Sequence, residues 1–304
     1  MISSFFFNYL KFVAYLHGIK IIDLKNNIFE LVKKNKKIVV IKKDFSFKKR
    51  FTKLRSEYKQ IIDGIKYFDL IFSYAVENIV DLSSNFYINY LGCKIETNFL
   101  QIKEISFAIN TYNKHYKLKE GDIVFDLGGY HGLYSVLASK EVGTSGKIYC
   151  FEPDPNNFEI CKRNFENNNL KNIILINKAV SDHSGSNLFF KRGHGSRIVD
   201  SSFKTNTKDS MCKVESISLS DFIREEDLKK IDFIKADIEG SEVELIKDYL
   251  EKILPLGIYP KMAIACYHYR KDLNDNTCSV IAKTFKDNGI KINIDNKKHL
   301  CIFV

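Results

Sequence analysis

The sequence predicts an α/β protein: a mostly parallel β-sheet with helices on both faces, preceded by a smaller N-terminal module. Three observations lead to this prediction. After Gly121, short apolar runs alternate with segments of helical periodicity, which is typical of strand–helix–strand units. A glycine-rich turn stands between the first apolar run and the first helical segment. All four prolines lie at Pro153 or beyond, so the N-terminal part differs in character from the rest.

Residues 1–115 form the expected N-terminal module, made of helices and a small hairpin. Apolar residues recur at helical spacing from Ser3 to Lys20, and the serines at its start could cap this helix. The same periodicity over residues 51–81 predicts a second helical region. Between Phe86 and Phe107 the pattern alternates around a glycine, which predicts a hairpin.

Residues 116–304 form the expected main domain. Its predicted strands are short apolar runs: Ile123–Leu127, Lys147–Phe151, Ile173–Ile176, Asp232–Ala236, Lys261–Cys266 and Leu300–Val304. Helical segments at 132–141 and 156–168 separate the first three. The polar stretch Gly193–Cys212 predicts a long loop, and long loops in compact domains often bind or cover ligands.

The formal net charge of +10 is concentrated in the N-terminal module. Residues 1–110 carry 18 basic and 10 acidic side chains, against 29 and 27 in the remainder. The densest part, residues 33–55, contains eleven lysines and arginines and a single acid. A basic surface attracts nucleic acid, anionic lipid or acidic substrates, but a solvated lysine-rich face is the simpler interpretation.

The seven cysteines and the apolar segments restrict the class of protein. An odd number without a CxxC pair, mostly inside apolar runs, predicts buried thiols in a reducing cytoplasm rather than disulfides or a zinc site. Lys11 interrupts the first apolar run, and no small-residue cleavage site follows, so we expect no secretory leader. No run of 18 uncharged apolar residues exists, so we expect no membrane-spanning helix.

The strongest motif is the glycine-rich turn, Asp-Leu-Gly-Gly-Tyr-His-Gly at residues 126–132. Gly128, Gly129 and Gly132 allow a tight turn and the close approach of a ligand. The spacing departs from the dinucleotide pattern GxGxxG, and Asp126 would repel a pyrophosphate. Asp126 therefore favours a cationic or zwitterionic ligand.

Glu152 ends the next predicted strand, twenty residues after the turn. An acid at this place can accept hydrogen bonds from both hydroxyls of a ribose. S-adenosylmethionine carries a sulfonium, an ammonium and a ribose, so it meets both demands. After the third strand, the backbone of Ala179 and Val180 could pair with adenine and Asp182 could accept its amino group, although a plain strand-to-turn exit explains Asp182 equally well.

The fourth strand leads into Ile-Lys-Ala-Asp-Ile-Glu-Gly-Ser-Glu at residues 234–242. Together with the glycine-rich turn and the Phe-Glu-Pro run at 151–153, this segment resembles the FkbM family of S-adenosylmethionine-dependent methyltransferases, over roughly residues 115–304. The resemblance implies a class I Rossmann-like methyltransferase fold with seven strands, the last antiparallel. It also implies O-methyl transfer to hydroxyls of sugars, glycans or natural products.

The resemblance also implies roles for individual residues. Asp126, Gly128 and Gly132 would line the methionine part of the cofactor, and Glu152 would bind the ribose. The cofactor site is completed by neighbours in the same motifs: Gly129, His131 and Pro153. Asp237, at the end of the fourth strand, would lie beside the transferred methyl group.

Asp237 and His268 are the candidate catalytic residues. Both follow strands whose carboxyl ends face the ligand in this architecture. A neutral imidazole can accept a proton from a hydroxyl, although a buried structural histidine remains an alternative. Lys235 is expected to pair with a nearby acid, and Glu242 suits the first turn of a helix. Asp237, Glu239 and His268 are residue types that bind divalent cations, but we expect no metal site.

The sequence therefore favours a cytoplasmic S-adenosylmethionine-dependent O-methyltransferase with a saccharide or glycan acceptor. An RNA methyltransferase with a basic N-terminal module is one alternative, although no Pro-Pro-Tyr run follows Asp237 and nucleic acid is not the expected partner. The other is a scaffold protein at the inner face of the membrane. Residues 1–55 would then contact anionic lipid or a glycosyltransferase.

Overall fold

The computed structural model divides into two compact units, residues 1–106 and residues 107–304. The division falls slightly before the boundary at residue 115 that the sequence indicates. The residues described are 2–24, 28–41, 61–62, 64–66, 69, 79–81, 87–97, 110–191, 196–199, 211–270, 272–295 and 301–304.

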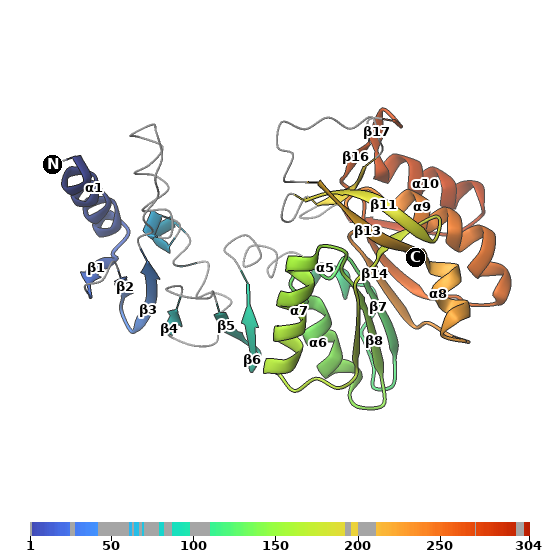
Figure 1. Cartoon of the computed structure of the whole chain (residues 1–304), viewed down its shortest axis with the longest axis horizontal. Helices are drawn as coiled ribbons and strands as arrows, with labels where there is room; N and C mark the ends of the chain where they lie inside the picture. The colour runs from blue at the N-terminus through green and yellow to red at the C-terminus, as the bar shows by residue number, and fades with distance from the viewer. Residues whose placement is uncertain are drawn as a thin grey trace. The chain divides into compact units, whose positions relative to one another are not determined.

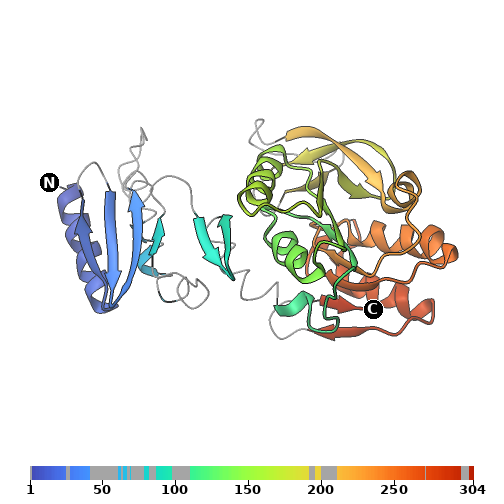
Figure 2. The same cartoon turned by 90° about the horizontal axis from the view of Figure 1, so that it is seen from below.

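The first unit contains a helix beside a small sheet (Figure 2). Its elements are α1 (Ile2–Leu16), β1 (Lys20–Asp23), β2 (Ile28–Lys33), β3 (Lys36–Ile41) and β4 (Ile79–Asp81). The strands follow the order β1-β2-β3-β4, antiparallel except for the last pair. Alternate residues of β2 and β3, such as Leu31 and Ile38, are buried. A second pair, β5 (Tyr87–Tyr90) and β6 (Cys93–Glu96), forms the predicted hairpin.

Strands β1 to β3 are not predicted from the sequence, and β4 lies where the sequence predicts helix. The alternation in β2 and β3 is short and lysine-rich, so the sequence there indicates only a basic stretch. Two of those lysines have acidic partners: Lys33 lies 2.8 Å from Asp69, and Lys37 lies 2.8 Å from Glu30. Residues 42–60, with the rest of the basic stretch, lie outside the described residues. None of the described helices combines the length and apolar character that crossing a bilayer requires.

The second unit is built on a seven-stranded sheet with the order β18-β19-β15-β14-β7-β8-β9. Its strands are β7 (Ile123–Leu127), β8 (Lys147–Phe151), β9 (Ile173–Ile176), β14 (Phe233–Ala236), β15 (Lys261–Ala265), β18 (Asn293–Asp295) and β19 (Cys301–Phe303). Strands β7, β8, β9, β14 and β15 are parallel, whereas β19 is antiparallel to both its neighbours. This arrangement confirms the predicted class I Rossmann-like fold.

Helices cover both faces of this sheet (Figure 1). They are α5 (Asn110–Tyr112), α6 (Leu133–Val142), α7 (Pro155–Asn167), α8 (Leu219–Glu225), α9 (Glu242–Asp248) and α10 (Thr277–Asp287), with a π-turn at Tyr249–Ile253 and a 3₁₀ turn at Leu254–Leu256. Because side chains alternate along a strand, neighbouring residues join different cores. Val124 packs with α5 and α6, while Phe125 packs with α8, α9 and α10.

A second, smaller sheet follows the third parallel strand. It contains β10 (Ala179–Ser181), β11 (Gly185–Phe190), β12 (Arg197–Val199) and β13 (Met211–Ser218), in the order β10-β13-β11-β12. The predicted loop 193–212 is therefore wrong in part, because it contains β12 and the start of β13. Residues 192–195 and 200–210 of that segment lie outside the described residues. A short ribbon of β16 (Tyr269–Arg270) and β17 (Asp275–Asn276) follows the fifth parallel strand.

The glycine-rich turn packs directly against the turn that follows β14. Gly128 has φ +84°, and a Cβ there would lie 2.0 Å from the carbonyl oxygen of Asp237. The backbone N–H of Asp237 in turn donates to the carbonyl of Leu127, at 3.0 Å. Only a residue without a side chain allows the two turns to meet this closely.

We expect Gly128→Ala to lower the free energy of unfolding by about 2–5 kcal/mol, because it adds steric overlap to left-handed backbone strain. Gly257→Ala is a matched control, since Gly257 has φ +76° and a Cβ added there would have nothing within 4 Å. The control should lose only about 1–2 kcal/mol. Urea unfolding measures both, and equal losses would contradict the close approach.

Candidate active site

A buried ion pair lies beneath the glycine-rich turn. Lys235 on β14 places its Nζ 2.9 Å from Oδ1 of Asp126 on β7, and both side chains are almost fully buried. Ser135 donates to the other carboxylate oxygen of Asp126, at 2.6 Å. The same Nζ donates to the carbonyl oxygen of Gly128, at 2.6 Å. The pair therefore joins the two central strands and fixes the turn above them.

This ion pair confirms that Lys235 pairs with a nearby acid, and it identifies that acid. From the sequence, the charge of Asp126 is expected to face a cationic ligand, but the structure gives that charge an internal partner. Burial alone would lower the pKa of Lys235, yet the combined attraction of Asp126 and Asp237 outweighs it and raises the pKa. The lysine therefore stays charged, which keeps the pair intact.

Glu152, directly after β8, ties the end of that strand to the glycine-rich turn. Its Oε2 accepts from the backbone N–H of Tyr130 at 2.7 Å, and its Oε1 accepts from that of Asp154 at 2.8 Å. Burial raises the pKa of Glu152 to about 8, although these hydrogen bonds oppose the rise. Oε1 also accepts a long hydrogen bond from Nδ2 of Asn157, at 3.4 Å, so the acceptor capacity left for a ligand hydroxyl lies on Oε2.

The other residues of the two motifs lie around Glu152. His131 is buried, with its ring stacked on Tyr130 at a centroid distance of 4.0 Å. Asn177 donates to the carbonyl oxygens of Glu152 and Pro153, at 2.8 and 3.2 Å. These contacts fix the backbone on both sides of the carboxylate.

The residues assigned to adenine lie in and after strand β10. Ala179 and Val180 are buried and pair with β13 in parallel register. Asp182 follows the strand and is exposed, with its Oδ1 2.6 Å from Nδ1 of His183. The hydrogen bond from His183 lowers the pKa of Asp182. Asp182 therefore presents a charged carboxylate beyond the end of the strand.

Asp237 lies at the carboxyl end of β14 and is held by two tyrosines. The hydroxyl of Tyr112 donates to its Oδ2 at 2.9 Å, and that of Tyr267 lies 3.1 and 3.2 Å from its two oxygens. Neither partner is predicted from the sequence. Tyr267 has a weak signal, since it adjoins His268, but Tyr112 precedes Asp237 by 125 residues and belongs to no motif.

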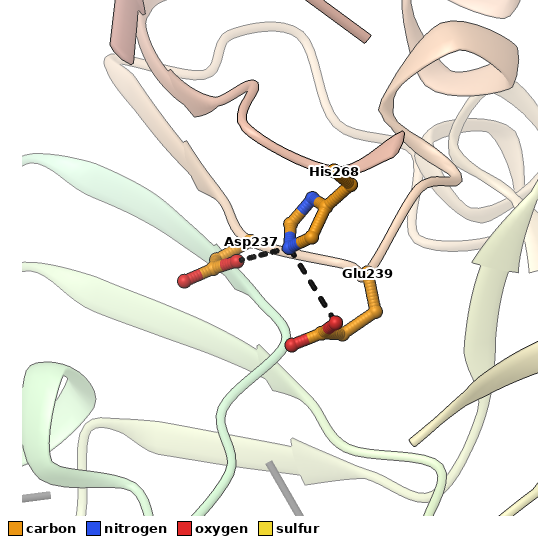
Figure 3. A group of neighbouring side chains, drawn as sticks. All are labelled: Asp237, Glu239 and His268. Carbon is orange, nitrogen blue, oxygen red and sulfur yellow. Dashed lines mark ion pairs between the residues drawn. The ribbon is translucent and has the colours of Figure 1, made fainter. Parts of the chain in front are cut away.

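His268 contacts three carboxylates. Its Nε2 lies 3.6 Å from Oδ1 of Asp237 and 3.5 Å from Oε2 of Glu239, as Figure 3 shows. Its Nδ1 lies 3.1 Å from Oε1 of Glu242, a contact with the geometry of an ion pair rather than of an aligned hydrogen bond. The two residues proposed as catalytic therefore lie side by side, together with two further acids.

Glu242 does more than begin helix α9. Its side chain is fully buried, and its two oxygens accept from the backbone N–H groups of Ile238 and Gly240, at 2.8 and 2.9 Å. These bonds shape the turn after β14, in which Glu239 adopts a left-handed φ of +56°. The turn places the Glu239 carboxylate next to His268.

The three carboxylates change the protonation of His268. Burial alone would lower its pKa, but Glu242, Asp237 and Glu239 outweigh that effect and raise the pKa to about 9. Burial also raises the pKa of Glu239 to about 7. The neutral imidazole expected from the sequence is therefore not what this cluster holds at neutral pH.

The family is shown by sequence comparison. Residues 126–288, more than half of the chain, match the family model described as the methyltransferase FkbM domain. This range contains the glycine-rich turn, Glu152, Asp237 and His268. The chain therefore belongs to the FkbM methyltransferase family, as the resemblance in the sequence indicates.

Two curated proteins are similar to this chain. Hexuronic acid methyltransferase AglP of Haloferax volcanii is 27% identical over 132 residues, which cover 42% of this chain and 50% of that protein. The chain thus spans about half the length of this relative. Methyltransferase sdnD of Sordaria araneosa is 27% identical over 206 residues, which cover 57% of this chain and 77% of that protein.

Solved structures show weaker similarity. An FkbM methyltransferase from Methylobacillus flagellatus is 18% identical, with a TM-score of 0.40 over 62% of this chain and 45% of that one. A fibrillarin from Aeropyrum pernix is 14% identical, with a TM-score of 0.38 over 94% of this chain and 96% of that one. Because both TM-scores are below 0.5, the family assignment rests on the family model.

We expect Lys235→Met to lower the free energy of unfolding by about 3–5 kcal/mol, because it leaves the buried Asp126 carboxylate unpaired. Asp126→Asn should also destabilise, and the double variant should lose less than the two single losses added together. Lys283→Met, which breaks an exposed pair with Asp287, should cost less than about 1 kcal/mol. Urea unfolding measures all four, and strict additivity would contradict a coupled pair.

We expect the free energy of unfolding to fall as pH rises from about 4.5 to 8, because the folded protein retains a proton on Glu152 that the unfolded chain has lost. The slope from this one group is at most about 1.4 kcal/mol per pH unit. Glu152→Gln should flatten the dependence in that window, whereas Glu159→Gln, on an exposed position of α7, should leave it unchanged. Unfolding curves with identical pH slopes for wild type and Glu152→Gln would contradict this.

Proposed function

We propose that the chain is an S-adenosylmethionine-dependent O-methyltransferase whose acceptor is a hydroxyl of a sugar, glycan or related metabolite. The observation that carries the proposal is the meeting of three motifs at one edge of the sheet. Gly128 packs on the backbone of Asp237, and the backbone of Tyr130 binds Glu152. Family membership supports methyl transfer, and the name of the relative AglP supports a sugar-type acceptor.

The residues around Glu152 fit the cofactor. A carboxylate at the end of the second parallel strand suits the hydroxyls of a ribose, and Oε2 has a lone pair to offer. In this proposal the backbone of the turn at residues 128–132 lies along the methionine part, while Asp182 and the backbone of strand β10 lie near adenine. In this proposal Asp126 acts indirectly: its carboxylate pairs with Lys235, and this ion pair holds the glycine-rich turn.

Asp237 and His268 are proposed to meet the acceptor. When bound, S-adenosylmethionine would supply a methyl carbon that bonds to the acceptor oxygen as the carbon–sulfur bond breaks, and the hydroxyl proton would pass to the Asp237 carboxylate that accepts its hydrogen bond. The two tyrosine hydroxyls on Asp237 fix its carboxylate in one orientation. A fixed carboxylate can accept a hydrogen bond from the acceptor hydroxyl and align it for transfer, which is the main task of the protein in such a displacement.

Two variants should separate cofactor binding from methyl transfer. Glu152→Gln keeps the side chain's volume but replaces one carboxyl oxygen with an amide nitrogen that cannot accept a hydrogen bond, and we expect it to weaken S-adenosylmethionine binding in calorimetry, while Glu159→Gln binds like wild type. Asp237→Asn should bind the cofactor normally yet lose about 100- to 10,000-fold in methyl transfer.

Transfer is measured with methyl-labelled cofactor and a panel of hexoses, uronic acids and their oligosaccharides, with the methyl position assigned by NMR. Failure of the folded wild-type protein to bind S-adenosylmethionine would reject the proposed function. Transfer to a nitrogen instead of a hydroxyl would reject its O-methyl part.

A further inference from the structure

We propose that Asp237, Glu239 and His268 bind a divalent cation at the carboxyl edge of the sheet, through Oδ1, Oε2 and Nε2 respectively. The proposal departs from the sequence-based expectation of no metal, because spacing along the chain did not show how the three side chains converge. Asp237 and Glu239 come from the turn after β14, and His268 comes from the segment after β15. Figure 3 shows one ring nitrogen facing both carboxylates.

The distances between the three donor atoms suit a shared ion. Nε2 lies 3.6 Å from the Asp237 oxygen and 3.5 Å from the Glu239 oxygen, and all three atoms lie within 4.8 Å of one another. Two ligands that are each about 2.1 Å from an ion lie between about 3.0 Å apart at a right angle and about 4.2 Å apart on opposite sides. The observed separations to Nε2 fall within that interval.

The second observation is the condition of the histidine itself. Its side chain is only 9% exposed, and among the described residues Nε2 has no hydrogen-bond partner. Both carboxylates are too far away for a good N–H···O bond, which normally spans 2.7–3.2 Å. A buried ring nitrogen that faces two carboxylates without a hydrogen bond to either is suited to bind a metal ion that the two carboxylates share.

The opposite ring nitrogen faces a carboxylate, as that of metal-binding histidines often does, here with the geometry of an ion pair. Nδ1 lies 3.1 Å from the fully buried carboxylate of Glu242. A carboxylate at this nitrogen fixes the ring orientation, and when an ion displaces the proton from Nε2 the lone pair of that nitrogen is directed toward the metal. Glu242 is itself fixed by two backbone N–H groups of the turn that carries Glu239. One buried acid therefore positions both the histidine and a neighbouring carboxylate.

The charge of the cluster also favours a cation. Three carboxylates, from Asp237, Glu239 and Glu242, surround one imidazole. Lys235 is bound to Asp126 and to the glycine-rich turn, although its charge also acts on Asp237, as that of Arg197 acts on Glu239. Arg270 binds Glu244 and Asp272. A divalent ion would offset the excess negative charge directly.

One nitrogen and two oxygen donors form a mixed set that suits a first-row divalent ion, because imidazole favours Zn²⁺, Fe²⁺ and Ni²⁺ whereas carboxylates favour Mg²⁺ and Mn²⁺. Mn²⁺ is the probe ion for this set. Three protein ligands leave coordination positions open for water or an acceptor oxygen. Contact between the ion and an acceptor is the only part of the inference that rests on the proposed function: the ion would hold the acceptor hydroxyl beside Asp237. Binding of the ion itself requires neither cofactor nor acceptor.

The test is Mn²⁺ binding to the full chain after treatment with chelator, without S-adenosylmethionine. Electron paramagnetic resonance should show saturable binding of one ion per chain, and electron spin echo envelope modulation should show nitrogen coupling from the imidazole. His268→Gln should abolish the nitrogen coupling, and Asp237→Asn and Glu239→Gln should each weaken binding. Glu242→Gln keeps all three ligands and should weaken binding about 10- to 100-fold.

Matched controls come from acid and histidine side chains outside the cluster. His183→Gln removes the exposed histidine beside Asp182, and Glu251→Gln removes an exposed acid, so neither should alter Mn²⁺ binding. The folding of each variant is checked by circular dichroism. The nitrogen coupling is measured on the wild-type protein, so that part of the test does not depend on any variant folding. Absence of saturable binding, or binding without nitrogen coupling, would overturn the site while leaving the proposed methyl transfer open to its own test.

Discussion

The ion pair between Asp126 and Lys235 is the constraint on which the site depends. It joins the first and fourth parallel strands at their carboxyl ends, and it binds the carbonyl of Gly128 in the same contact. Removing one partner of such a buried ion pair strongly destabilises the fold, because the remaining charge cannot reach water. The turn above it is consequently held in one conformation before any ligand arrives.

A second set of contacts fixes the neighbouring turns at the carboxyl edge of the sheet. Gly128 meets the backbone of Asp237, and Glu242 shapes the turn that follows. Glu152 performs the corresponding task on the other side by holding the backbone of Tyr130 and Asp154. The carboxylates of Glu152 and Glu242 both accept hydrogen bonds from backbone N–H groups. The carboxyl edge of the sheet is thus a set of turns fixed by buried carboxylates.

The sequence predicted the parallel sheet well because strands buried on both faces are continuous apolar runs, as in Ile123–Leu127 and Lys147–Phe151. The glycine-rich turn, Glu152 and Asp237 were found for a related reason, since they directly follow such strands. The small sheet that contains β12 was missed because polar residues interrupt its strands, so no continuous apolar run marks them. In the first unit, β2 and β3 were hidden by their lysines, whose charge dominated the pattern.

The pairings within the site could not be predicted from spacing. The partner of Asp126 lies on a strand more than one hundred residues later, and only the strand order brings them together. The protonation of His268 depends on three carboxylates whose turn is set by Glu242. Such effects arise from the three-dimensional arrangement of charges, which a single sequence does not contain.

The short helix α5 has a consequence for where the catalytic domain begins. Tyr112 lies on α5, before the first parallel strand, yet its hydroxyl binds Asp237 and its ring packs against Tyr134 of α6. A shortened protein that started at residue 116 would retain every strand of the main sheet and every motif of the family. It would nevertheless lack one of the two hydroxyls that orient Asp237, so a catalytic fragment has to begin no later than Asn110, where α5 begins.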